Sequence, residues 1–100
     1  MSLKPSKQER YLDITYKNSN AETVAAGGTF VPTFVKVGSD DLTNYEPMSL
    51  IRFGFTGVTA LTYRVVDITD LTEWRIDNPT SSSKAIGANN VVIIIRYKHK

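Results

Sequence analysis

The sequence contains no cysteine, which excludes disulfide bonds, thiolate zinc sites and a cysteine nucleophile. Histidine occurs once, as the penultimate residue His99. A general base has to be held within about 3 Å of the proton that it removes, and we expect a penultimate residue to be a solvated tail side chain. Because neither residue type is placed to support catalysis, we expect no enzymatic activity and no cofactor.

Long hydrophobic runs are also missing. The longest aliphatic stretch has five residues, Val91–Ile95, whereas a transmembrane helix needs about 20. Residues 1–17 contain no apolar segment of the kind found in secretory signal peptides. We therefore expect a soluble protein without membrane insertion. Its location is not specified by the sequence, and a virus particle is one option.

Residues that favour helices are scarce, since alanine and leucine contribute only six residues each. Valine, isoleucine and threonine together contribute 28 of the 100 residues, and these branched side chains pack well on a pleated sheet. Over residues 10–17, Leu12, Ile14 and Tyr16 alternate with polar residues. This alternation predicts a strand with one buried face.

Turn residues divide the rest of the chain into further strands. The pair Gly27-Gly28 is typical of a tight hairpin turn, and Pro32 indicates that the second arm of this hairpin is an edge or bulged strand. Gly54 indicates a bulge or a close backbone approach. The predicted strands after the first cover residues 22–26, 29–37, 48–55, 58–69, 73–77 and 90–98.

Two segments allow sharper statements about their environment. The run Val91–Ile95 has no polar alternate residue, which predicts a central strand buried on both faces. Residues 70–77 fit either a strand over 73–77 or a helical turn that Asp70 caps, and we favour the strand.

Together these features predict an all-β protein of about seven short strands with no substantial helix. The expected fold is an antiparallel β-sandwich, Ig-like or jelly-roll-like, with a small barrel as the alternative and the strand order left open. We expect residues 10–100 to form a single sandwich domain. Residues 1–9 are polar and contain Pro5. We expect them to form a flexible basic arm, in which Met1-Ser2-Leu3 can also be read as an expression leader.

Charge is distributed unevenly along the chain. The net charge is +2 over residues 1–17, −4 over residues 18–83 and +4 over residues 84–100. Solvated surface charge is the simplest interpretation, and head-to-tail assembly between basic ends and an acidic centre is the second. Nucleic acid is not an expected partner, because no dense basic patch with interleaved aromatic residues is present. The basic residues at the two ends are Lys4, Lys7, Arg10, Arg96, Lys98 and Lys100.

Two long loops, 38–47 and 78–90, are the predicted contact regions, since loops of this length in small domains tend to be functional. Asp40 and Asp41 are also a candidate cation site, because hard cations prefer oxygen ligands from such loops. Solvated loop charge is the simpler interpretation of these carboxylates. The predicted contact residues are Asp40, Asp41, Tyr45, Glu46, Pro79 and Lys84.

Aromatic residues offer one alternative site. An exposed Trp74 with Tyr63 nearby would form a platform on which a sugar ring could stack. Trp74 in phase with Ile76 is more simply an inward-facing core residue.

The sequence as a whole favours a binding or building role over chemistry. We expect a non-enzymatic structural or assembly module, such as a small phage or virus particle protein, that forms a homo-oligomer and contacts other proteins. The alternative is a module that recognises carbohydrate or a host or cell surface.

Overall fold

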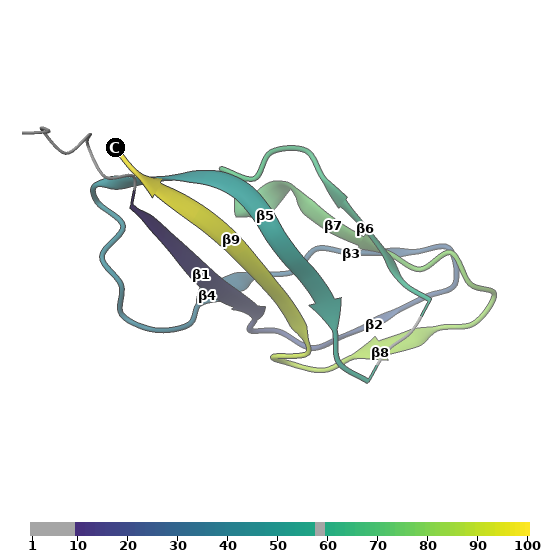
Figure 1. Ribbon diagram of the computed structural model, residues 1–100. Helices are drawn as coiled ribbons and strands as arrows, with labels where there is room; N and C mark the ends of the chain where they lie inside the picture. The colour runs from purple at the N-terminus through teal and green to yellow at the C-terminus, as the bar shows by residue number, and fades with distance from the viewer. Residues whose placement is uncertain (1–9, 58–59) are drawn as a thin grey trace, which may run out of the picture.

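The computed structural model describes residues 10–57 and 60–100 and shows an all-β chain. Every strand pairing is antiparallel, and several sheets pack together as a β-sandwich (Figure 1). The predicted fold class is therefore confirmed. No helix in these two ranges is long and apolar enough to cross a membrane. Residues 1–9, including the predicted basic arm, lie outside the described residues.

Nine strands build the described part of the chain, more than the seven expected. The main sheet has the order β4-β1-β9-β5, and it contains β1 (Tyr11–Asn18), β4 (Phe34–Lys36), β5 (Tyr45–Phe55) and β9 (Val91–His99). The second sheet has the order β3-β7-β6, and it contains β3 (Thr29–Phe30), β6 (Thr62–Val65) and β7 (Trp74–Asp77). A two-stranded sheet joins β2 (Glu22–Val24) to β8 (Lys84–Ile86).

Strand β9 lies between β1 and β5, so its predicted central position is confirmed (Figure 1). Ile93 and Ile95 point inward and are buried. Val92 and Ile94 point to the opposite face of the sheet and are only half-buried. The prediction that this run is buried on both faces is thus met on one face only.

The core lies between the sheets and consists of two clusters of buried side chains, one around Trp74 and one around Phe30 and Ile76. Trp74 is at its centre, with its ring stacked on Phe53 at a centroid distance of 5.8 Å and edge-on to Phe34 at 5.7 Å. Alternate inward residues of β1, β7 and β9 supply most of the buried surface, as period-2 patterning requires. The buried apolar residues are Ile14, Tyr16, Val24, Phe30, Trp74, Ile76, Ile86, Val91, Ile93, Ile95 and Tyr97.

The predicted hairpin around Gly27-Gly28 is wrong, although the tight turn itself is present. Gly27 has a φ of +70°, but β2 pairs with β8 and β3 pairs with β7. The reason is Asn78, whose backbone carbonyl accepts from the Gly27 N–H at 2.8 Å and whose N–H donates to the Gly28 carbonyl at 3.0 Å. The turn is therefore a corner between two sheets.

Strand boundaries differ from the predictions at several further points. The second arm of the expected hairpin is split around Pro32 into β3 and β4. The register of β5 is interrupted at Met48 and Ile51, whereas Gly54 lies directly opposite Val92, so the bulge predicted at Gly54 lies elsewhere in the strand.

Residues 70–77 combine both predicted alternatives. A 3-10 turn, η1 (Leu71–Glu73), is capped by Asp70, and β7 follows immediately. Strand β8 was not predicted, because three residues are too few to show a period. Residues 58–59 of the predicted strand 58–69 lie outside the described residues, and β6 covers only its middle.

Candidate functional site

The outer face of the second sheet is polar. Asp77 on β7 accepts a hydrogen bond from the Thr29 hydroxyl at 2.7 Å and forms an ion pair with Arg64, whose Nε lies 2.5 Å from the carboxylate. These donors, with Arg64 the stronger, hold the pKa of Asp77 below its usual range. This face follows the usual rule of polar residues outward and apolar residues inward.

The outer face of the main sheet breaks this rule. Val35 and Val37 are 53% and 47% exposed on and just after β4, and Ile51 is 44% exposed on β5. Ile94 lies directly opposite Thr15 and Arg52 on the two neighbouring strands. We call Val35, Val37, Ile51, Val92 and Ile94 the outer apolar face; all five side chains are β-branched.

Charged residues of both signs accompany the outer apolar face. Asp13 and Arg96 form a two-pronged ion pair across β1 and β9, with nitrogen–oxygen distances of 2.8 and 3.0 Å. The Arg96 guanidinium lowers the pKa of Asp13. Lys17, four residues after Asp13 on the same strand and opposite Val92, also faces outward. Arg52, directly opposite Ile94, adds a positive charge within the face. The outer side of the main sheet therefore carries apolar and charged side chains together.

The predicted acidic contact loop lies at the end of the main sheet, before β5. Asp41 accepts from both the N–H and the hydroxyl of Thr43, at 2.9 and 2.5 Å, and these bonds lower its pKa. The ammonium of Lys36 donates to the Asp40 carbonyl oxygen. Within residues 10–57 and 60–100, no group of three carboxylate or imidazole side chains could hold a metal ion. The pair Asp40–Asp41 is thus joined by no third ligand.

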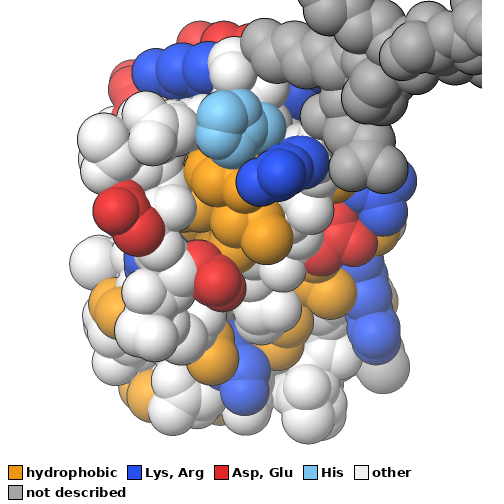
Figure 2. Space-filling model, turned by 60° about the vertical axis from the view of Figure 1, so that its left-hand side comes forward, with side chains coloured by type: hydrophobic (Ala, Val, Ile, Leu, Met, Phe, Trp, Pro, Cys, Tyr) orange, Lys and Arg blue, Asp and Glu red, His pale blue; other side chains and the backbone are white. Residues whose placement is uncertain are grey.

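The basic C-terminal residues meet this acidic loop within one molecule. Glu46 lies directly opposite Lys98, and the Tyr45 ring contacts the His99 ring at a centroid distance of 5.0 Å. Lys100 donates its backbone N–H to the Asn44 carbonyl at 2.8 Å. Figure 2 shows the imidazole beside a hydrophobic patch, with acidic and basic side chains around it.

His99 is consequently the last residue of β9 and not a free tail residue, contrary to the prediction. Its backbone N–H donates to the Arg10 carbonyl at 2.9 Å, so the two predicted basic ends come together here. Lys4 and Lys7 lie outside the described residues.

The loop 78–90, which contains Pro79, is pinned at both ends by buried asparagines that the sequence interpretation overlooked. The Asn78 amide donates to the carbonyls of Val24 and Ser82 at 3.0 and 2.8 Å. The Asn18 amide group donates to the Gly87 carbonyl at 3.0 Å, and its oxygen accepts from the Val91 N–H at 2.8 Å. The available signal was an asparagine directly after an alternating strand, in both cases.

The predicted aromatic platform is not formed. Trp74 is fully buried, and its indole N–H has no hydrogen-bond partner in the described part of the molecule. Tyr63 is 45% exposed, but one side of its ring stacks on Phe53 at 3.9 Å. Burial of the tryptophan follows from its inward phase on β7, so it offers no surface for a sugar ring.

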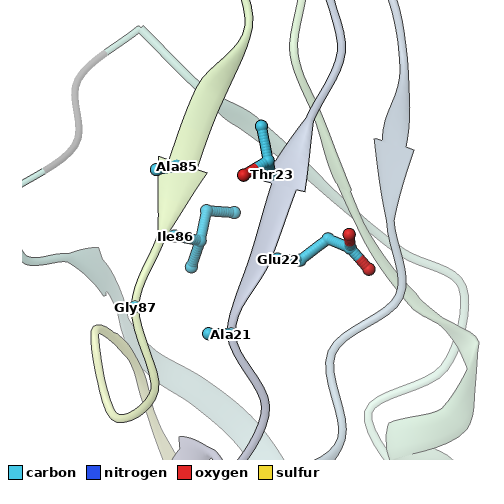
Figure 3. A pocket seen from close by; sticks show the side chains of 6 residues that line it. All are labelled: Ala21, Glu22, Thr23, Ala85, Ile86 and Gly87. Carbon is cyan, nitrogen blue, oxygen red and sulfur yellow. The ribbon is translucent and has the colours of Figure 1, made fainter.

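A hollow with a volume of about 460 Å³ lies beside β2 and β8 (Figure 3). Glu22 is its one ionisable lining residue, and its carboxylate points away from β8. General acid–base catalysis needs partners within hydrogen-bond reach, and this lining supplies one group only. Lys84, another predicted contact residue, is on β8 opposite Val24.

No protein-family model, curated protein sequence or solved structure matches this chain.

Proposed function

We propose that this protein is a non-enzymatic structural module that self-associates, a building block for a larger assembly such as a phage or virus particle. The outer apolar face is the observation that carries this proposal. Five β-branched side chains on one sheet face, three of them 44–53% exposed, make a surface that a second protein surface would cover favourably.

The arrangement of polar groups supports the same proposal. Asp13, Asp41 and Asp77 are each engaged by named donors, so they serve the stability of turns and strands. The long loop 78–90 is held by buried asparagines, and a rigid scaffold loses little conformational entropy on association. The assignment to a phage or virus particle rests on the type of domain alone.

The predicted contact loops and termini take a secondary role in this proposal. Lys98 and Glu46 already face each other in one copy, so head-to-tail electrostatics contribute less than the net charges of the segments indicate. Asp40 in the loop before β5 and Lys84 on β8 would add contacts at the edge of an interface, where charges affect association rate and salt dependence more than affinity.

Sedimentation velocity with the full chain tests the proposal. We expect the mass average to rise above that of the monomer between about 1 µM and about 1 mM, the range in which small interfaces become populated. The rise should persist at high salt, because apolar contact is not screened. A protein that stays strictly monomeric over this concentration range, at low and at high salt, would overturn the proposal.

Recognition of carbohydrate or a host surface stays as the alternative, with Tyr63 as its one exposed ring from the predicted platform. Binding on a glycan array that is lost in Tyr63→Ala, with the thermal melting curve retained, would favour this alternative over self-association.

A further inference from the structure

We propose that two copies of this chain pack their outer apolar faces against each other, sheet on sheet, around a two-fold axis that lies between the two sheets and runs perpendicular to β1 over Thr15. This inference rests on the proposed self-association and names its interface.

The first argument is the composition of the central strand. A strand of five consecutive aliphatic residues suits a sheet that is covered on both faces. In β9 the core covers Val91, Ile93 and Ile95, whereas Val92 and Ile94 lie half-buried on the outer side. Packing against a second copy would supply the missing cover.

Residues 1–9 are a poor source of such cover by composition. Met1, Leu3 and Pro5 are their only apolar members, and the segment also contains Lys4 and Lys7. A second copy instead brings five β-branched side chains, which interdigitate well between sheets about 10 Å apart.

The size of the face sets the expected strength. The main sheet has four strands about 4.8 Å apart with a mean length of about 27 Å. Its outer face therefore has an area of about 500 Å² per copy, and an interface between two copies would bury about 1,000 Å² in total. This area is at the lower end for specific interfaces. We therefore expect a dimer that dissociates on dilution.

The two charged residues of β1 on this face match each other under this rotation. Asp13, Thr15 and Lys17 lie on the same side of β1, two residues apart. A two-fold axis at Thr15 places Asp13 of each copy against Lys17 of the other, and an isologous interface requires this self-complementarity.

The first test replaces one apolar side chain on the face. Val37→Asp should weaken the dimer at least tenfold, because a carboxylate would be buried against aliphatic groups. Val66→Asp is the matched control, since Val66 is 79% exposed and lies just after β6, away from the face, and its dimer should be unchanged. Ile94→Thr is a second variant that keeps β-branched geometry, and far-ultraviolet circular dichroism verifies folding of all three.

The second test uses the absence of native cysteine. Thr15→Cys should be linked to its counterpart by a bismaleimide spanning about 10 Å, the distance between packed sheets. Thr62→Cys, on the outer face of the second sheet opposite Asp77, should stay unlinked. Cross-linking should disappear when the protein is diluted below its dissociation constant.

The third test exchanges charges. Asp13→Lys and Lys17→Asp should each weaken association, and the double variant should recover at least half of the loss. Self-association that is equal in Val37→Asp and the control, together with cross-linking through Thr62→Cys, would overturn this interface and leave the proposed function standing. A chain that is monomeric throughout would overturn both.

Discussion

Asn18 and Asn78 are the two buried polar residues in the described part of the chain, and each ties distant segments together. Asn78 uses its amide and its carbonyl oxygen, with the oxygen accepting from the Thr80 N–H at 3.0 Å and the Thr80 hydroxyl at 2.6 Å. A buried amide with this many partners fixes loop positions that apolar packing alone would leave open.

Asn78→Ala should lower the free energy of unfolding by about 3 kcal/mol, because the buried carbonyls and N–H groups that it serves would lose their partner. Urea unfolding followed by fluorescence of Trp74 measures the change. Asn44→Ala is the control, since Asn44 is exposed, and it should change stability by less than about 0.5 kcal/mol. Equal effects of the two substitutions would contradict the role assigned to Asn78.

A second buried polar contact joins β1 to β9, where the hydroxyls of Tyr16 and Tyr97 lie 2.5 Å apart. Tyr16→Phe and Tyr97→Phe should each cost about 1–2 kcal/mol, because each leaves a buried hydroxyl unpaired. The double variant should cost clearly less than the sum of the two. A double-mutant cycle from chemical denaturation measures this coupling, and strict additivity would show that the hydroxyls do not interact.

Several strands of this protein are determined by their pairing partners more than by their own sequences. The alternation in β1 and the aliphatic run of β9 are strong local signals, and both strands were predicted correctly. The partners of β2 and β3 could not be predicted, because bonds from Asn78, about 50 residues away, decide where the turn between them points. Strand β8 has no pattern of its own and exists through its pairing with β2.

The turn between β2 and β3 depends on a glycine in the left-handed region. Gly27→Ala should destabilise the protein by about 1 kcal/mol, since a Cβ is disfavoured at a φ of +70°. Gly54→Ala is the matched control, because its nearest new neighbour would be an Arg52 nitrogen at 3.6 Å, an ordinary contact. We expect this control to be neutral or slightly stabilising in thermal melts. A larger loss at Gly54 than at Gly27 would contradict the assignment.

The molecule as a whole should be most stable between mildly acidic and mildly alkaline pH. Hydrogen bonds from Arg96 and Arg64 lower the pKa values of Asp13 and Asp77, so their stabilisation is present above about pH 4 and is lost as the pH falls further. Burial raises the pKa of Tyr16. Its contribution is present below about pH 10 and is lost above, where the unfolded chain ionises first.

The urea midpoint measured from about pH 2 to about pH 11 should therefore form a plateau with two falling limbs. Asp77→Asn should flatten the acid limb, and Tyr16→Phe should flatten the alkaline limb. A midpoint that rises toward acid would contradict the role of the aspartates.

The outer apolar face depends on the arrangement of the whole molecule, and it could not be predicted from the sequence. The face formed by Val35, Val37 and Ile94 gathers residues from separate strands, and its existence depends on the strand order β4-β1-β9-β5. Sequence patterns predict which side of one strand is apolar, but they do not predict which strands lie next to each other. The burial of Trp74, in contrast, followed from local phase alone.

The bond from His99 to Arg10 places the first described residue and the last residue of β9 at the same end of two neighbouring antiparallel strands. A mechanical load applied between these ends would open the β1–β9 ladder one bond at a time, because the force runs along the hydrogen bonds and not across them. The domain should therefore yield at low force when it is pulled through its own termini. It should resist much more strongly when Gly87, before the start of β9, is pulled parallel to that strand. The force would then act across the hydrogen bonds, and every bond from β9 to β1 and β5 would be loaded at once.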